Sequence, residues 1–440
     1  MKFNIMLYAL SVLTILLPLT YSCQTGLYTL NDSILYYSER YFSEIEEITN
    51  EDNGNLWGVN LYGPVMIVKR EAKLIVTNES DNEQYLSRNG EVFTGELLDN
   101  LNIANTAIEW KGKRWTMLLW PLPENKYDRN ALFMHELFHR IQPTLGFDNL
   151  GMETNSHLDE REGRIYAKLE LEALKSALIV EDINLRNEHI RNALFFRVYR
   201  HKQFPDSKQN ENSLELLEGI AEFTGIILSG RSHPEMILHF EKKINDFYSN
   251  PTFVRSFCYH AIPIYGYLMS QENKNWNRSI TRETNLTDYI IDFYNINIPD
   301  DLRQKILALH QEYNADGIIR YEDKREIEKK QRISFYMDQF INGDILEFSF
   351  ENMNISFNPQ NMEPLPGHGT VYTTIRVTDN WGILEVEKSA LLSPGWDKLT
   401  ITKPLQIEGE KIYGDGWNLK LNSEWTVEQV SDARYIVKKK

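Results

Sequence analysis

The pattern of apolar residues along the chain changes twice, from strand-like to helical and back to strand-like, and this order limits the folds that the chain can adopt. Between Leu56 and Trp120, short runs of β-branched and aromatic residues are separated by Gly and Asn, which predicts a small meandering sheet. From 126 to 332 apolar residues recur at helical spacing, and beyond Ile333 strand-like runs and turn signals return. We therefore predict an α+β fold with an N-terminal sheet, a mainly helical core and a C-terminal all-β domain.

The predicted domain boundaries lie where the residue pattern changes between strand-like and helical. A chain of 440 residues exceeds what one hydrophobic core usually supports, so we expect two or three folded units. We predict a tether and short helix at 23–55, one domain at 56–332 (sheet 56–120, helices 126–332) and a β-domain at 333–440. One helix is predicted shortly after residue 126 and is described below. The helices predicted after it are Leu158–Leu178, Ile183–Tyr199, Ser213–Leu228, Met236–Phe247, Thr252–Leu268 and Leu302–Glu328.

The first residues are typical of an export signal. Lys2 precedes the apolar run Ile5–Leu19, which is shorter than the roughly 20 residues that a membrane-spanning helix needs. Small residues at Thr20 and Ser22 are spaced as at a signal-peptidase site, so we predict a signal peptide at 1–22.

Cys23 and Gln24 follow this site, and the segment resembles the lipobox of bacterial lipoproteins, with Thr20 where Leu is usual. The resemblance implies a cell-envelope lipoprotein anchored at Cys23; without acylation the protein would be secreted or periplasmic. In that second case Cys23 could pair with Cys258, the other cysteine of the chain.

The formal net charge of -16 argues against a general affinity for nucleic acid, because no net positive field replaces the phosphate counterions. Contact with a membrane is expected only through the anchor at Cys23. The sequence does not define an oligomeric state.

The segment Met134–His139 carries the pattern His-Glu-X-X-His. Asp128 is the predicted N-cap of its helix, which Pro143 and Gly146 end. Four residues correspond to about 400° of helix rotation, so His135 and His139 share one face and can bind one zinc ion. Glu136 beside them can take a proton from water that the zinc activates.

A catalytic zinc ion usually has three protein ligands and one open position. The segment Glu218-Gly219-Ile220-Ala221-Glu222 resembles the Glu-Gly-X-Ala segment of gluzincin metallopeptidases, which include aminopeptidase N-like enzymes and bacterial collagenases. The resemblance implies that Glu218 is the third ligand and that Glu222 orients a histidine ligand. It also implies that Gly219 and Ala221 are small so that their helix can pack closely against the helix of His135 and His139.

The sequence contains other candidates for the third zinc ligand. Glu218 follows His139 by more residues than is usual in those families, so the helices between them would be an insertion. Glu153, Asp159 and Glu160 lie nearer to the familiar distance, and Glu222 is a further alternative.

Hydrolysis of an amide also needs a group that stabilises the oxyanion, which gluzincins supply from Tyr or His. Tyr259 and His260 are the predicted residues, followed by Tyr265 and Arg255.

Together these features predict an exported zinc metallopeptidase that hydrolyses peptides or proteins, with Zn²⁺ as cofactor. Two alternatives stay open. One is a non-catalytic surface binding protein with a degenerate peptidase domain. The other is a zinc hydrolase that acts on a non-peptide amide or ester.

Overall fold

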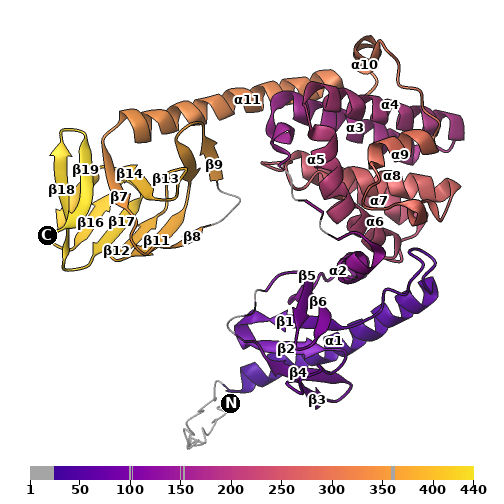
Figure 1. Cartoon of the computed structure of the whole chain (residues 1–440), viewed down its shortest axis with the longest axis horizontal. Coiled ribbons are helices and arrows are strands. Elements are labelled where there is room, and N and C mark those ends of the chain that lie inside the picture. Colours follow the sequence, from indigo (N-terminus) through magenta and orange to yellow (C-terminus); the bar gives the residue numbers. More distant parts are fainter. Residues whose placement is uncertain (1–23, 99–100, 102, 149, 152–153, 358–361) are drawn as a thin grey trace, which may run out of the picture. The chain divides into compact units, whose positions relative to one another are not determined.

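The computed structural model describes residues 24–98, 101, 103–148, 150–151, 154–357 and 362–440. The predicted signal peptide and Cys23 lie outside these residues. The described chain combines helices with several sheets and ends in an all-strand region, which agrees with the predicted α+β class (Figure 1). Among the described helices, none combines the length and apolar character that crossing a membrane requires.

The chain divides into two compact units, each built from separate stretches of sequence. Unit 1 contains the residues up to Glu153 together with Gln209–Lys242 and Cys258–Phe293. Unit 2 contains Thr154–Lys208, Lys243–Phe257 and Tyr294–Lys440. The domain boundaries that were predicted from the residue pattern stay predictions.

Unit 1 begins with helix α1 (Gln24–Asp52), in a region where the sequence predicted a tether and a short helix. A six-stranded sheet follows in the order β3-β4-β2-β1-β6-β5. Its strands are β1 (Val65–Lys69), β2 (Leu74–Thr77), β3 (Ser87–Asn89), β4 (Val92–Glu96), β5 (Thr106–Trp110) and β6 (Lys113–Leu119). Strand β6 pairs in parallel with β1 and antiparallel with β5, which places β5 at one edge of the sheet.

The helices of unit 1 come from two later stretches as well as from the segment after the sheet. They are α2 (Lys126–Ile141), the short turn η2 (Gln142–Leu145), the π-turn η4 (Glu215–Gly219), α6 (Ile220–Ile227), α8 (Cys258–Glu272), η5 (Trp276–Ser279) and α9 (Leu286–Phe293). Helices α5 (Ser207–Leu214) and α7 (His233–Tyr248) include residues of both units. Helix α2 packs against β5, β6 and α6, and α8 packs against α6 and η4.

Unit 2 contains a helical part whose interior includes buried ion pairs. Its elements are η3 (Ser156–Asp159), α3 (Arg161–Ile179), α4 (Ile183–Gln203), α10 (Leu302–Leu309), α11 (Ala315–Met337) and η6 (Asp338–Asn342). Glu170 on α3 accepts hydrogen bonds from Arg197 and Arg200 on α4 at 2.6 and 2.8 Å, so the buried charges are paired. The helix predicted at Leu302–Glu328 is two helices, and Asn314 between them adopts a left-handed φ of 53°.

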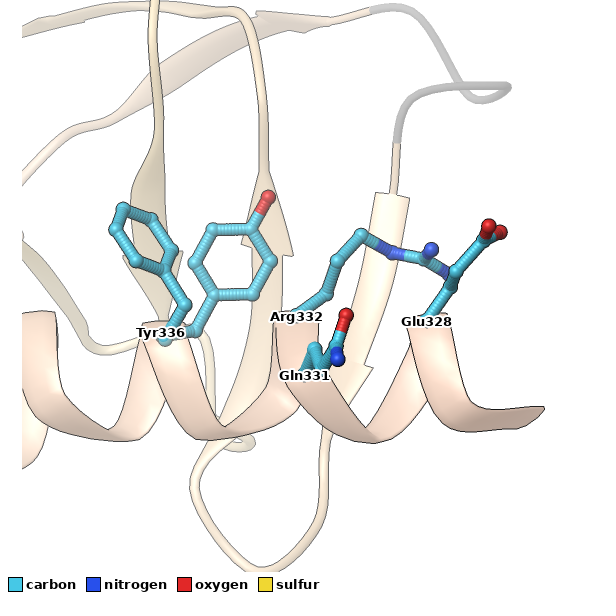
Figure 2. A pocket seen from close by; sticks show the side chains of 5 residues that line it. Glu328, Gln331, Arg332 and Tyr336 are labelled. Atoms are coloured by element: carbon cyan, nitrogen blue, oxygen red, sulfur yellow. The ribbon is translucent and has the colours of Figure 1, made fainter. Parts of the chain in front are cut away.

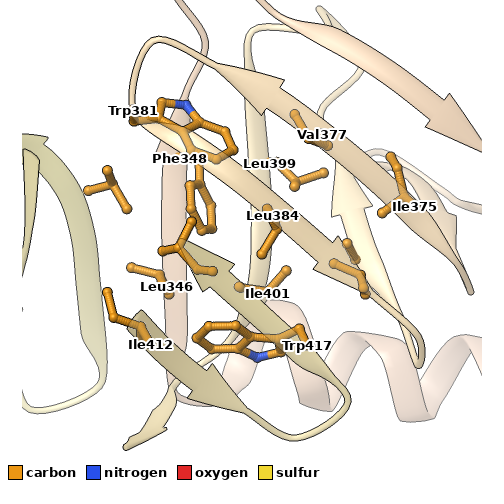
Figure 3. Packing of buried hydrophobic residues seen from close by; sticks show 14 of the residues in the cluster. Leu346, Phe348, Ile375, Val377, Trp381, Leu384, Leu399, Ile401, Ile412 and Trp417 are labelled. Carbon is orange, nitrogen blue, oxygen red and sulfur yellow. The ribbon is translucent and has the colours of Figure 1, made fainter. Parts of the chain in front are cut away.

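The last strands of unit 2 form two sheets in the orders β18-β19-β7-β14-β13-β10-β9 and β15-β16-β17-β12-β11-β8. They enclose an apolar core that includes Phe348, Trp381 and Trp417 (Figure 3). The strands are β7 (Ile345–Ser349), β8 (Asn354–Phe357), β9 (Met362–Leu365), β10 (Gly369–Tyr372), β11 (Ile375–Asp379), β12 (Gly382–Val386), β13 (Ala390–Leu392), β14 (Lys398–Thr402), β15 (Pro404–Glu408), β16 (Lys411–Gly414), β17 (Trp417–Leu421), β18 (Trp425–Ser431) and β19 (Arg434–Lys439).

The end of α11 packs on this β-region through a second apolar cluster that includes Tyr336 and Phe340. Beside it, Arg332 Nε lies 3.0 Å from Glu363 Oε2 on β9. Figure 2 shows the groove lined by five α11 residues: Glu328, Gln331, Arg332, Phe335 and Tyr336. The groove is formed by successive turns of one helix.

Candidate metal centre

Helix α2 presents the His-Glu-X-X-His residues on one of its faces. Asn125 caps the helix by accepting hydrogen bonds from the backbone N–H groups of Tyr127 and Asp128, so the predicted cap at Asp128 is wrong by three positions. The helix ends at Ile141, and the next turn closes at Gly146 with φ 85°, close to the predicted end. Phe133 and Leu137 are fully buried and anchor the helix in unit 1.

Two imidazoles and one carboxylate converge at a single point in unit 1. His135 Nε2 lies 3.0 Å from His139 Nε2, and Glu218 Oε2 lies 3.3 Å from His139 Nε2 and 3.5 Å from His135 Nε2. Among the described residues, these three form the one group of His, Cys, Asp and Glu side chains with ligand atoms close enough to share an ion.

The outer nitrogen of each histidine meets an oxygen atom. His135 Nδ1 lies 3.0 Å from Glu222 Oε2, and His139 Nδ1 lies 2.8 Å from Gln142 Oε1. Both oxygens can only accept hydrogen bonds, so each Nδ1 donates. In the neutral imidazoles this leaves both Nε2 lone pairs directed at the point of convergence.

Glu218 reaches this point from the π-turn η4, which interrupts the helix predicted at Ser213–Leu228. Gly225 on α6 lets α2 and α6 approach, because a Cβ atom there would come within 2.5 Å of the carbonyl oxygen of Ala131 on α2. The expectation that Gly219 makes this contact is wrong, since a Cβ atom on Gly219 would instead meet Ile262 on α8. Tyr259 on α8 donates a hydrogen bond of 2.7 Å to Glu218 Oε2, and its ring stacks on His135. Three helical segments therefore meet at the cluster.

The electrostatics of the cluster favour a cation. Burial lowers the pKa of His135, but hydrogen bonds to Glu218 and Glu222 outweigh it and raise the value to about 10. Burial raises the pKa of Glu218, yet its hydrogen bonds to His135, His139 and Tyr259 hold it well below the usual range. Both shifts have the same cause, which is that the carboxylates around the two imidazoles favour positive charge at this point.

Glu136 is buried and has an unused oxygen atom. Burial raises the pKa of its carboxyl group, an effect that the neighbouring histidines oppose. Within the described part of the chain no hydrogen-bond donor reaches Glu136 Oε2. A buried polar atom of this kind usually has a partner, so a water molecule or a substrate is the expected occupant of the space beside it.

The cluster lies at a cavity of about 460 Å³. Asn105, Thr106 and Ala107 at the start of β5 line it, as does Arg114 on β6. The remaining lining residues are His135, Glu136, His139, Gln142, Pro143, Phe147, Asp148, Leu150, Leu217, Glu218 and Tyr259. The cavity is therefore built by residues of unit 1.

The structure brings together only some of the residues singled out in the sequence. Of the two predicted oxyanion-stabilising residues, Tyr259 lines the cavity; His260 is buried on the same helix and is not among the described lining residues. Tyr265 is fully buried further along α8, and Arg255 belongs to unit 2.

The other candidates for the third zinc ligand are not part of the group formed by His135, His139 and Glu218. Glu153 lies outside the described residues, and Asp159 accepts a hydrogen bond of 2.9 Å from the backbone N–H of Phe253 in unit 2. Glu160 precedes the first turn of α3. Glu222 faces the outer nitrogen of His135, which is the position of an orienting residue.

Gln142 and Arg114 are site residues that the sequence did not indicate. Gln142 follows His139 by three positions and could have been suspected from that spacing, since residues i and i+3 are neighbours on a helix. Arg114 is placed at the cavity by strand pairing, for which the sequence holds no local signal.

Comparison of the chain with known protein families, with characterised proteins and with solved structures finds no match. The function must therefore be inferred from the chemistry and geometry of this site.

Proposed function

We propose that this chain is a zinc-dependent peptidase in which His135, His139 and Glu218 hold the metal and Glu136 is the general base. The observation that carries this proposal is the set of 3.0, 3.3 and 3.5 Å separations between the three ligand atoms. Ligands bound tetrahedrally at about 2.0–2.1 Å from zinc lie roughly 3.4 Å from one another, so these residues fit the ion.

The donor set also suits a catalytic rather than a structural zinc. Three protein ligands leave one coordination position for water or substrate, whereas structural sites are usually closed by four. A bound zinc ion would lower the pKa of water towards about 7 and polarise the carbonyl of the scissile bond.

Glu136 supplies the proton transfers in this proposal. Its unused Oε2 takes the proton of the attacking water as the new C–O bond forms, and it passes that proton to the amine nitrogen as the C–N bond breaks. Tyr259 is the candidate donor to the developing oxyanion, a role in which its single hydroxyl hydrogen would turn from Glu218 to the substrate. Burial and the neighbouring Glu218 raise the pKa of Tyr259, which keeps its hydroxyl protonated and able to donate.

The position of β5 favours a peptide over a small amide or ester. Thr106 and Ala107 line the cavity, and β5 is an edge strand paired on one side with β6. The backbone groups of such an edge can bind an extended peptide as an additional strand. A non-peptide substrate would make no use of this edge.

The test is metal content and peptide hydrolysis of the mature protein beside Glu136→Gln. We expect about one zinc per chain in both proteins and a loss of several orders of magnitude in kcat for the variant, because only the base is removed. Glu283→Gln is the matched control, since this exposed carboxylate lies in the same unit.

Full activity of Glu136→Gln would exclude the proposed mechanism. A parent protein without zinc, even after reconstitution, would favour the binding-protein alternative. Zinc together with hydrolysis of esters but not of peptides would favour a zinc hydrolase that acts on a non-peptide amide or ester.

A further inference from the structure

We propose that Gln142 is a positioning residue that sets both the tautomer of His139 and the separation of His139 from Glu218. This inference rests on the proposed zinc site and extends it to a residue beyond the ligands and the base. Gln142 lies at the junction between α2 and η2, and only 3% of it is exposed.

The oxygen half of the amide acts on the second histidine. Gln142 Oε1 lies 2.8 Å from His139 Nδ1 and accepts its hydrogen, which leaves the Nε2 lone pair for the metal. Amide oxygen and nitrogen atoms are distinguished here by their partners. The nitrogen lies near two backbone carbonyls, which only accept, so the oxygen must face the histidine.

The nitrogen half acts on the segment that carries the third ligand. Gln142 Nε2 donates to Leu216 O at 3.0 Å and to Leu217 O at 2.9 Å, and these two carbonyls directly precede Glu218 in the π-turn. The position of Gln142 is itself secured, since its backbone N–H donates to Phe138 O. One buried side chain thus joins the end of α2 to η4.

Loss of this amide should affect the metal before it affects the fold. Without the acceptor, the imidazole of His139 can carry its hydrogen on Nε2 and rotate, and without the donors the π-turn is held less tightly. Removal of such orienting partners typically reduces metal affinity by about 10–100-fold.

The experiment compares three variants with a matched control. Gln142→Met keeps the length of the side chain but removes both halves of the amide, Gln142→Ala removes the side chain, and Gln142→Glu keeps the acceptor alone. Asn130→Ala is the control, because this buried amide on the same helix donates to a backbone carbonyl, Ser229 O at 3.3 Å, and among the described residues it is not a hydrogen-bond partner of His135 or His139.

Two readouts are needed: zinc affinity by competition with a chromophoric chelator, and the ring ¹⁵N shifts of His139 in the metal-free protein. We expect zinc to bind about 10–100-fold more weakly to Gln142→Met and Gln142→Ala, less so to Gln142→Glu, and within about threefold of the parent to Asn130→Ala. The Nδ1–H tautomer of His139 should be lost in Gln142→Met and kept in Gln142→Glu.

The outcomes separate this inference from the proposed function. If the parent binds zinc and Gln142→Met binds it equally well, the positioning role is overturned while the zinc site stands. If the parent binds no zinc, the proposed function fails, and the tautomer of His139 still decides the role of Gln142. Failure of Gln142→Ala to fold leaves Gln142→Met and Gln142→Glu as the deciding variants.

Discussion

At the scale of single residues, the hydroxyl of Tyr259 has the clearest test. Tyr259→Phe keeps the ring that stacks on His135 and removes the donor to Glu218. We expect kcat to fall by about 10²–10³-fold, because the proposed donor to the oxyanion is lost, while zinc content and KM change little. Steady-state kinetics with metal analysis checks this, and an unchanged kcat would remove Tyr259 from the mechanism.

A second residue-scale prediction concerns stability and pH. Asp81 is buried and accepts backbone hydrogen bonds from Glu83, Tyr85 and Leu86 at 2.7, 3.1 and 2.7 Å. Burial raises the pKa of Asp81, but these hydrogen bonds outweigh it and lower the value below the usual one. The carboxylate therefore stabilises the fold above the unfolded pKa of about 3.9, and this contribution is lost as pH falls through the lower folded value.

Asp81→Asn should accordingly reduce the free energy of unfolding at pH 7 by about 1.5–3 kcal/mol, the range for hydrogen bonds to a charged group. The difference from the parent should shrink as the pH falls below about 4. Urea unfolding at several pH values measures this, with the exposed Glu91→Gln as control. A difference that is independent of pH would contradict the assignment.

The residues of the site differ in how far the sequence could predict them. His135, Glu136 and His139 are adjacent on one helix, so their spacing alone indicates a common role. Glu218 depended on a short resemblance, because no local rule connects two segments 79 residues apart. The contact of Gln142 with His139 could have been suspected from their spacing, but its two bonds to carbonyls of the π-turn cannot be located from sequence.

At the scale of secondary structure, the contact of α2 with α6 makes Gly225 sensitive. In Gly225→Ala the new methyl group would lie 2.5 Å from Ala131 O and 3.2 Å from His135 Cβ, so the helices must separate. We expect a loss of about 1–3 kcal/mol of stability together with weaker zinc binding.

Thermal unfolding and chelator competition test this prediction. Gly395→Ala is the control, since the nearest atom to its Cβ would be Asp397 Oδ1 at 3.3 Å, which belongs to a movable side chain. Normal zinc affinity in Gly225→Ala would show that the histidine face of α2 tolerates displacement.

Long periodic elements were predicted better than their interruptions. The helices predicted at Leu158–Leu178 and Ile183–Tyr199 appear as α3 and α4 with shifts of a few residues. The π-turn at Glu215–Gly219 was not predicted, because apolar periodicity continues through it. The break before α11 was also missed, since the left-handed backbone of Asn314 is one that a non-glycine residue rarely adopts.

At the scale of the whole molecule, the separate apolar cores predict more than one unfolding transition. Zinc at about 100 times its Kd should stabilise unit 1 by about 2.7 kcal/mol, if the unfolded chain does not bind it. Trp381→Ala removes a fully buried ring whose centroid lies 4.8 Å from the ring centroid of Phe348. The substitution should destabilise the β-region by about 3–5 kcal/mol.

Calorimetry of the parent and the variant, each with zinc and with chelator, tests this prediction. Zinc should raise one transition and Trp381→Ala should lower another, with zinc stoichiometry unchanged in the variant. Movement of a single common transition in both experiments would show that the chain unfolds as one cooperative block.

The division of unit 1 into separate stretches of sequence also imposes an order of assembly during synthesis. Ribosomes add about 5–20 residues per second, so the 79 residues between His139 and Glu218 delay the carboxylate by about 4–16 s. Tyr259 follows Glu218 by another 41 residues. In the proposed zinc site, the two histidine ligands therefore leave the ribosome before the third ligand has been made. If the proposal holds, zinc would bind with full affinity only after most of unit 1 has been synthesised.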